Sequence, residues 1–361
     1  EVIVTIYDYI DGIKPTDEEA KELARKRNDG LLKPLGSLGK LEDIAIKFAG
    51  ITGKVLNSAE KRCLIVMAAD NGVVEEGVAG TPKEMTRNHT ANIAAGISGV
   101  GVLAKYAGSD LKVVDIGIEG ECKSDAVIAR KIANGTANFA KGPAMSRPEA
   151  EQGIMIGIEM VKLCKDEGYE LLGTGEMGIG NTSSTAACCM ALTGLDADSA
   201  VGKGGGLSDE GLARKKEIIK RALALNKPDA SDPMDVIAKV GGFDIAGLVG
   251  CFLGAAYYRM PIVIDGAISA LSALIACRLQ PLCADYIFGS HISREPSYMH
   301  MMREIKIEPM IDLGMRLGEG SGCPLAFHII GSACAMLRNM QSFADQNMDD
   351  TYRIDMREDK R

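Results

Sequence analysis

Short apolar segments alternate with longer helical segments along most of the chain. The apolar segments are rich in β-branched residues, as strands are; they are RCLIVMAA (62–69), LKVVDIGI (111–118), YELLGTG (169–175), PIVID (261–265) and ADYIFG (284–289). The segments between them are rich in Ala and long enough for helices. This alternation predicts an α/β fold, in which a mostly parallel sheet is covered by helices on both faces.

The N-terminal part of the chain has a helical pattern instead. Thr16 stands before the segment DEEAKELARKRN (17–28), and Thr16 with Glu19 fits a capping box, so we expect a helix to begin there. A second helix is expected after the turn KPLGSLG (33–39).

Polar residues follow all five predicted strands. They are Asp70-Asn71, Asp115 with Gly117, Gly175-Glu176, Asp265-Gly266 and Ser290-His291. A single acid beside a glycine at a strand end is most often part of a turn or a helix cap. Because open α/β sheets bind ligands outside the carboxyl ends of their strands, the five together predict a polar cleft.

The composition is that of a globular protein. Hydrophobic residues make up 46% and charged residues 25% of the 361 positions, which excludes intrinsic disorder and allows one large or two ordinary domains. The net charge of −8, with 4% aromatic residues and no Trp, argues against nucleic-acid binding, which needs a basic field or stacking platforms. The charge-rich segment 349–361 is expected to be a solvated tail.

The cysteines and the apolar segments bear on the compartment. The ten cysteines include no CxxC pair and there are only four histidines, so we expect reduced thiols and no metal site. The opening segment EVIVTIYDYIDGIK does not resemble a signal peptide. The longest uncharged segments, 177–195 and 320–337, are interrupted by polar residues, Gly or Pro, so no membrane span is expected. These features together favour a cytoplasmic protein.

Two glycine-rich segments are candidate phosphate sites. They are GTGEMGIGNTSS (173–184) and GKGGGLSDEGLARKK (202–216), and glycines before a helix allow backbone N–H groups to surround a phosphate. Neither is a Walker loop, and the first is a poor dinucleotide fingerprint. A tight turn is the alternative for each. Lys203, Arg214 and Lys215 could clamp a phosphate, or could lie on a solvated helix face.

Glu319 lies between glycines in LGEGSG (317–322), just before an apolar helical segment. Its carboxylate could interact with the dipole of that following helix, or could act as a general base beside an apolar pocket. Of the histidines, only His291 lies beside other strand-end polar groups; His89, His300 and His328 are expected at surface or satisfied helical positions. No nucleophile motif is present, and Cys188-Cys189 fits a buried helix.

Taken together, these segments resemble one known family. The segments that carry the resemblance are KPLGSLGKLE (33–42), AADNGVVEEGV (68–78), NGTANFAKGPAM (134–145), GEMGIGNTSS (175–184), GKGGGLSDEGLARK (202–215), GGFDIAGLVG (241–250), DGAIS (265–269), GSHISREP (289–296) and LGEGSG (317–322). Their order and spacing are similar to those of the nicotinate-nucleotide:dimethylbenzimidazole phosphoribosyltransferase family, over almost the whole chain.

The resemblance implies a fold, a reaction and an assembly. It implies a Rossmann-like catalytic domain over residues 60–325 and a small helical domain from residues 1–59 and 326–361. The reaction would transfer phosphoribose from nicotinate mononucleotide to the lower-ligand base of a cobamide, releasing nicotinate, without a cofactor or a metal. The assembly would be a dimer, either a homodimer or a heterodimer with a paralogous subunit.

The resemblance also assigns residues. Glu319 matches the general base and Glu176 a second active-site carboxylate. The backbone cradle matches Gly178, Gly180, Gly204 and Gly206. Polar groups near the ribose match Asp244 and Asp265, and phosphate contacts match Lys215, Ser293 and Arg316.

The segment that the family uses around the incoming base differs here. The family's commoner AxDHGV reads AADNGV, with Asn71 in place of His, and its GVSAYPxEVT reads GVAGTPKEMT, with Ala79 and Thr81 in a segment that ends at Arg87. The loss of a hydroxyl and of an aromatic ring would change the polarity and shape of the pocket, so phenol or p-cresol is an alternative acceptor to dimethylbenzimidazole or a purine base. A catalytically silent paralogue in a heterodimer also fits these differences, and the α/β pattern alone allows a dinucleotide-dependent oxidoreductase.

Overall fold

The computed structural model describes residues 4–358, and a seven-stranded parallel sheet forms its centre. The strand order is β3-β2-β1-β4-β5-β6-β7. The strands are β1 (Arg62–Ala69), β2 (Ser109–Gly117), β3 (Val127–Ala129), β4 (Leu171–Met177), β5 (Ile262–Ile264), β6 (Ile287–His291) and β7 (Pro309–Ile311). The order reverses between β1 and β4, where a Rossmann-type sheet opens a crevice at its carboxyl edge. The predicted α/β class is confirmed.

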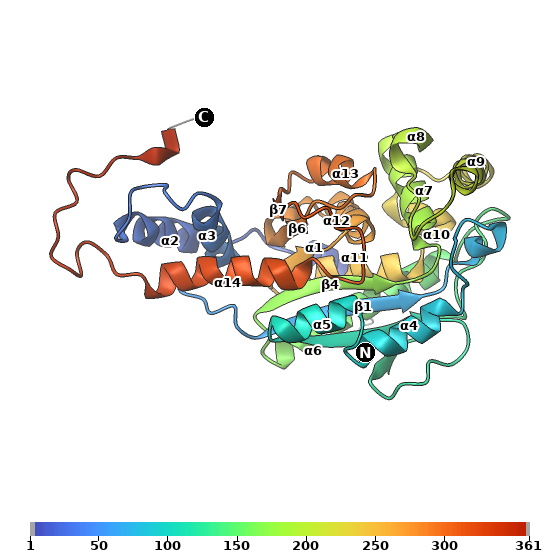
Figure 1. Cartoon of the computed structure of the whole chain (residues 1–361), viewed down its shortest axis with the longest axis horizontal. Helices are drawn as coiled ribbons and strands as arrows, with labels where there is room; N and C mark the ends of the chain where they lie inside the picture. The colour runs from blue at the N-terminus through green and yellow to red at the C-terminus, as the bar shows by residue number, and fades with distance from the viewer. Residues whose placement is uncertain (1–3, 359–361) are drawn as a thin grey trace.

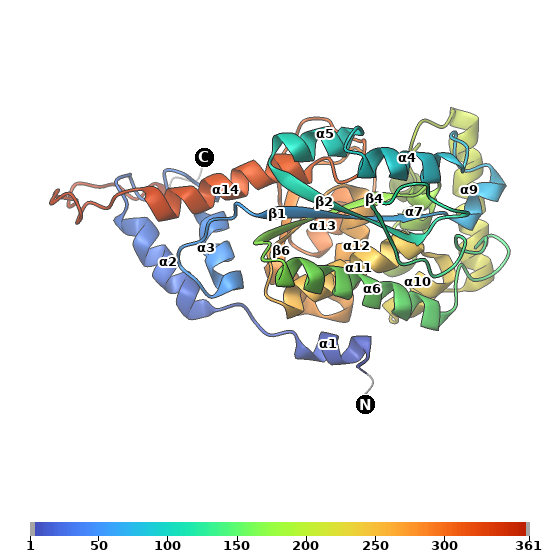
Figure 2. The same cartoon turned by 90° about the horizontal axis from the view of Figure 1, so that it is seen from below.

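Helices cover both faces of this sheet. In Figure 2, α4 (Met85–Ala94), α5 (Gly99–Tyr106) and α14 (Cys323–Asn339) lie on one side of the strands, and α11 (Phe243–Tyr257) and α12 (Ala267–Leu279) lie on the other. The remaining helices are α6 (Arg147–Asp166), α7 (Asn181–Thr193), α8 (Ala197–Ala200), α9 (Asp209–Asn226), α10 (Pro233–Val240) and α13 (Tyr298–Glu304), with 3₁₀ turns at Gly72–Glu76, Pro281–Tyr286 and Met356–Glu358. Because both faces are covered, β1 is buried along almost its whole length.

The N-terminal helices pack together at one end of the molecule. Figure 1 shows α2 (Glu18–Gly30) and α3 (Lys40–Thr52) there, reached by the far end of α14, whereas α7, α8 and α9 lie at the opposite end. The short helix α1 (Ile6–Gly12) packs on α11 and α6 instead. A buried ion pair joins Lys33 Nζ, between α2 and α3 in the sequence, to Glu42 Oε1 on α3 at 2.8 Å. Within residues 4–358, no helix is both long and apolar enough to cross a membrane.

Several local predictions differ from the structure. The predicted Thr16–Glu19 capping box is wrong, because α2 begins one residue after Asp17, whose side chain accepts a hydrogen bond from Ala20 N. The predicted strand 284–289 begins at Ile287, because the preceding residues form a 3₁₀ turn that opens with Pro281. The expected solvated tail is largely exposed, but Arg353 and Arg357 contact Asp29 on α2; residues 359–361 lie outside the described part.

α6 and α11 cross in close contact. This crossing depends on glycines, because a Cβ at Gly157 would lie 2.0 Å from Gly247 O and a Cβ at Gly250 would lie 1.9 Å from Ile154 O. Backbone atoms cannot move aside as side chains can. Any larger residue at these positions must therefore push α11, which also lies against β1, β2 and β4, away from the sheet.

We expect the substitution Gly250→Ala to lower the free energy of unfolding by about 3 kcal/mol through this overpacking. The control is Gly30→Ala at the end of α2, where an added Cβ would meet nothing within 4 Å. Urea denaturation of both variants measures the difference. Equal stability of the two variants would show that α6 and α11 do not approach so closely.

Candidate active site

A cavity of about 410 Å³ lies at the carboxyl ends of β4, β5 and β6. Its lining comes from six separate parts of the chain, namely residues 78–89, 176–182, 203–205, 265–269, 291–295 and 316–319. Three of the five predicted strand-end groups line it: Glu176, Asp265 and His291. The other two do not. Asp70 and Asp115 accept backbone hydrogen bonds from Glu119 and Ile118 and so fix the loop after β2, as turn residues do.

The backbone around Glu319 has an unusual conformation. Gly318, Glu319 and Gly320 all have positive φ, at 87°, 63° and 98°. This conformation costs a non-glycine residue roughly 1–2 kcal/mol, so Glu319 lies in a strained turn. A Cβ at Gly318 would lie 2.7 Å from Glu176 Oε1, and one at Gly320 would lie 2.6 Å from Leu64 Cδ2. Only glycine therefore fits on either side of Glu319.

The Glu319 carboxylate is held between two helices that lie far away in the sequence. Its Oε1 lies 2.6 Å from His89 Nε2 on α4, and its Oε2 accepts a hydrogen bond of 3.1 Å from Val100 N in the first turn of α5. The first N–H groups of a helix lack internal partners and favour an anion. The sequence pattern suggested the dipole of α14; the structure places the carboxylate at the start of α5 instead. His89 is a hydrogen-bonded helical residue, as expected, but its partner is Glu319 and it lines the cavity, which the sequence did not indicate.

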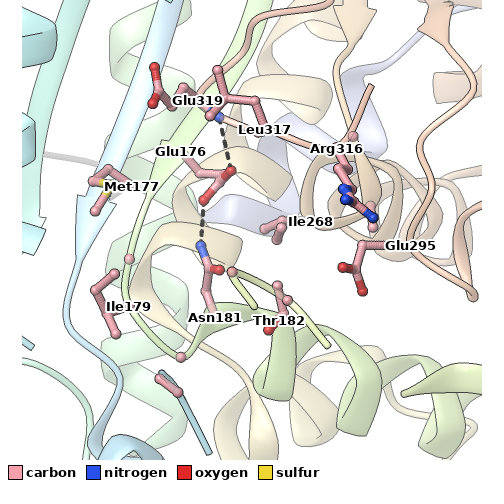
Figure 3. A pocket seen from close by; sticks show the side chains of 18 of the residues that line it. Glu176, Met177, Ile179, Asn181, Thr182, Ile268, Glu295, Arg316, Leu317 and Glu319 are labelled. Atoms are coloured by element: carbon pink, nitrogen blue, oxygen red, sulfur yellow. Dashed lines mark hydrogen bonds between the residues drawn. The ribbon is translucent and has the colours of Figure 1, made fainter. Parts of the chain in front are cut away.

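Glu176 lies behind this turn and is hydrogen-bonded on both oxygens. Oε1 accepts from Glu319 N at 3.2 Å and Oε2 accepts from Asn181 Nδ2 (Figure 3). Asn181 Nδ2 also donates to Asp244 Oδ2 at 2.9 Å. Burial raises the pKa of Glu176, and burial together with the nearby charge of Glu176 raises the pKa of Asp244 to about 7. Asp244 does not line the cavity, and Asn181 Nδ2 bridges it to Glu176.

Asp265, rather than Glu319, lies at the start of α14. Its two carboxylate oxygens accept hydrogen bonds from Gly320 N at 3.0 Å and Gly322 N at 2.7 Å. Burial raises the pKa of Asp265 to about 7. His291 Nδ1 lies 3.8 Å away, and burial lowers the pKa of that imidazole, which favours its neutral form. This corner of the cavity therefore holds acceptors with little compensating positive charge.

Cationic and glycine residues line another part of the cavity. Figure 3 shows Arg316 beside Glu295, with Thr182 at the start of α7 facing the same space. Lys203 and Gly204 also line the cavity. Lys215 lies beneath this lining: its Nζ donates to Thr182 Oγ1 at 2.7 Å and to Gly202 O at 3.1 Å, and burial lowers its pKa to about 8. Arg214 points elsewhere, to Gly77 O.

Most of the residues that the resemblance assigned come together here. Those that line the cavity are Glu176, Glu319, Gly178, Gly180, Gly204, Asp265, Ser293, Arg316, Ala79 and Thr81. Those that do not are Gly206, Lys215, Asp244 and Arg87. Arg87 lies near the loop after β2, where a Cβ at Gly120 would be 2.9 Å from its Nη1. Met85 and His89 on the same helix, α4, line the cavity. Arg87 lies between them in the sequence and therefore on another face of the helix.

Sequence reasoning did not single out His89, Asn181 or Thr182. Asn181 and Thr182 could have been found because they begin a helix directly after glycines. His89 could have been found because it lies four residues after Met85, on the same helix face. Asn71 lies outside the cavity and accepts a hydrogen bond of 2.8 Å from Ser184. Among the described residues, no three His, Cys, Asp or Glu side chains are grouped to hold a metal ion.

Known proteins similar to this chain are phosphoribosyltransferases. A family model described as "Phosphoribosyltransferase" matches residues 13–348. A Clostridium perfringens protein named nicotinate-nucleotide–dimethylbenzimidazole phosphoribosyltransferase is 48% identical over 98% of both chains. One of the same name from Acetivibrio thermocellus is 51% identical over 91% of this chain and 93% of its own.

Solved structures agree with these relatives. The crystal structure of CobT from Thermus thermophilus has a TM-score of 0.88 and 37% identity, over 92% of this chain and 99% of that one. This TM-score shows that the two chains share the same fold. The chain therefore belongs to the phosphoribosyltransferase family of the nicotinate-nucleotide–dimethylbenzimidazole enzymes, which are pentosyltransferases.

Proposed function

We propose that the chain transfers the phosphoribosyl group of nicotinate mononucleotide to an aromatic lower-ligand base, with Glu319 as the general base. The products are nicotinate and the α-ribotide 5′-phosphate. The names of relatives at 48–51% identity support the donor and the type of reaction. The observation that carries the proposal is that three carboxylates from distant segments, Glu176, Asp265 and Glu319, line one cavity together with the cation Arg316.

The donor chemistry fits this arrangement. The leaving group of nicotinate mononucleotide is a pyridinium, so its departure neutralises a positive charge and needs no acid. Positive charge then develops on the ribosyl carbon, and buried acceptors such as Glu176 and Asp265 stabilise that charge. Attack from the face opposite to the leaving group inverts the anomeric centre, which gives the α product.

We place the donor's phosphate at the cationic part of the cavity. Arg316, Ser293, Thr182 and the backbone of Gly204 line this part and supply hydrogen-bond donors. Lys215 supports it from below through Thr182, so we propose that it positions the loop rather than holding the phosphate alone. Gly178 and Gly180 lie between this region and Glu176 and allow the backbone to approach the ribose.

The acceptor is placed beside Glu319. Met85, Ile179 and Leu317 supply apolar surface there, and Ala79 and Thr81 are small. Glu319 would remove the N–H proton of a benzimidazole or the O–H proton of a phenol in the same way. The names of the relatives favour dimethylbenzimidazole, and Ala79 and Thr81 change the polarity and shape of this part of the cavity, so we propose dimethylbenzimidazole, phenol and p-cresol as the candidate acceptors.

The same proposal includes an assembly and a division into domains. All cavity-lining residues lie between Val78 and Glu319, which fits a catalytic domain of residues 60–325 and a helical domain of residues 1–59 and 326–361.

Val102 and Tyr106 on α5, and Leu317 at the cavity, are 57%, 84% and 58% exposed. We propose that a second subunit, identical or paralogous, covers this apolar surface. The ten free cysteines, all within residues 4–358, fit a cytoplasmic location.

The role of Glu319 is tested by Glu319→Gln. We expect kcat to fall by about 10²–10⁴-fold, the usual contribution of a general base, with little change in the KM for nicotinate mononucleotide. Nicotinate release measures both, and Glu210→Gln on the exposed surface of α9 is the control. Unchanged activity of the assembled protein would reject Glu319 as the base and favour a catalytically silent subunit.

The acceptor is identified by nicotinate release with dimethylbenzimidazole, adenine, phenol and p-cresol offered in parallel. We expect release that depends on the acceptor, because the attack needs a bound nucleophile. A strong preference for dimethylbenzimidazole would reject the phenol hypothesis. If the folded chain is silent with every acceptor, adding a co-purified paralogous chain distinguishes a missing subunit from an incorrect proposal.

The reaction should depend on pH through Asp265. Because burial raises its pKa to about 7, this carboxyl is neutral below that pH and negatively charged above it. Only the charged form stabilises the ribosyl cation, so kcat/KM should increase as the pH rises through about 7. Asp265→Asn should be less active and should lose this acid limb. A variant that keeps the wild-type limb would assign it to another group.

A further inference from the structure

We infer that His89 is a positioning residue for the general base, an inference that rests on the proposed role of Glu319. Its Nε2 lies 2.6 Å from Glu319 Oε1, although the two residues are 230 positions apart in the sequence. The side chains are 26% and 8% exposed, so the bond lies at the cavity wall rather than on the open surface. None of the sequence motifs discussed above indicates that position 89 contributes to the site.

The Glu319 carboxylate has two donors within residues 4–358. Val100 N holds Oε2 at 3.1 Å, and His89 holds Oε1. The backbone N–H of Glu319 is directed elsewhere, to Glu176. A single donor leaves a carboxylate free to rotate about its last side-chain bond, whereas two donors on opposite oxygens fix its plane. His89 is therefore the side chain that decides where the remaining lone pairs of Glu319 point.

The setting of Glu319 makes this control necessary. Glu176 lies on the other side of the same turn, and a second carboxylate there repels the first. A Cβ at Gly99, next to Val100, would lie 3.4 Å from Glu319 Oε2, so the glycine leaves that oxygen without a side chain to confine it. Without His89, the Glu319 side chain keeps only the contact with α5. A shift of about 1 Å in a reacting group can cost a factor of 10² in rate.

The location of His89 also links the base to the acceptor pocket. His89 and Met85 are four residues apart on α4 and both line the cavity. A donor on that helix therefore aligns Glu319 with the same wall that contacts the acceptor. His89 is only half-buried and faces the cavity, so the bond is open to a bound acceptor rather than enclosed in helix packing.

The experiment compares His89→Ala, His89→Gln, Glu319→Gln and the double variant of His89→Ala with Glu319→Gln. Substrates are nicotinate mononucleotide with dimethylbenzimidazole or p-cresol, and Asn88→Ala on the exposed face of α4 is the control. We expect His89→Ala to lower kcat about 10–100-fold, with less than about a threefold change in the KM for nicotinate mononucleotide. Gln retains an N–H donor, so His89→Gln should recover activity to within about threefold of wild type.

The double variant tests whether His89 acts through Glu319. We expect it to be no slower than Glu319→Gln alone, because the base that His89 aligns is already absent. A further loss of the full His89→Ala factor would show that His89 acts independently, and His89→Gln as slow as His89→Ala would show that a donor is not what matters. Either result overturns the inference, as does wild-type kcat in His89→Ala.

A measurement without turnover separates this inference from the proposed function. The proton NMR spectrum of the wild-type chain should contain a downfield imidazole N–H resonance that is lost in both His89→Gln and Glu319→Gln. If no acceptor supports nicotinate release, even with a co-purified paralogous chain, but the resonance is present, the proposed function fails and the positioning bond stands. If release occurs and the resonance is absent, the inference fails alone. Thermal unfolding of each variant shows that it is folded.

Discussion

The site depends on how closely one turn of the chain approaches the end of β4. The carbonyl oxygen of Glu319 would lie 2.3 Å from a Cβ at Gly175, so the turn and the strand can touch only where the strand carries a glycine. This contact brings the Glu319 N–H to Glu176 and the Gly320 N–H to Asp265. Three carboxylates are thereby joined through backbone groups of a single turn, and each keeps its own hydrogen-bond partners despite their mutual repulsion.

Burial of these three carboxylates costs free energy, and hydrogen-bond donors around them offset that cost. A buried carboxylate is unfavourable unless N–H groups compensate it, and the donors here are mostly backbone amides and Asn181 rather than cations. Negative charge that lacks nearby cations is suited to a positively charged transition state. The cations Arg316 and Lys203 also line the cavity, in the region where we propose that the phosphate binds.

The elements that could be predicted from sequence are those with strong local signals. The predicted strand 62–69 coincides with β1, because a long buried apolar run has few other interpretations. β3 and β7 were not predicted, since each has three residues and no such run. The N-cap of α2 was misassigned by one residue because Thr16 and Asp17 are both good caps and the tertiary structure selects between them.

The contacts within the site join residues that lie far apart in the sequence, so local patterns could not predict them. Glycines around Glu319 and Glu176 indicated the two acids, but not that α5 receives the carboxylate or that His89 contacts it, since both partners lie more than 200 positions away. The same separation has a consequence for synthesis. Chains emerge from the ribosome with their N-terminal part first, and the segment 316–319 follows every other segment of the cavity lining. A nascent chain therefore presents the glycine loops and α4 well before Glu319 is made, so a chain that is cut short before this turn has most of the cavity lining without the proposed base.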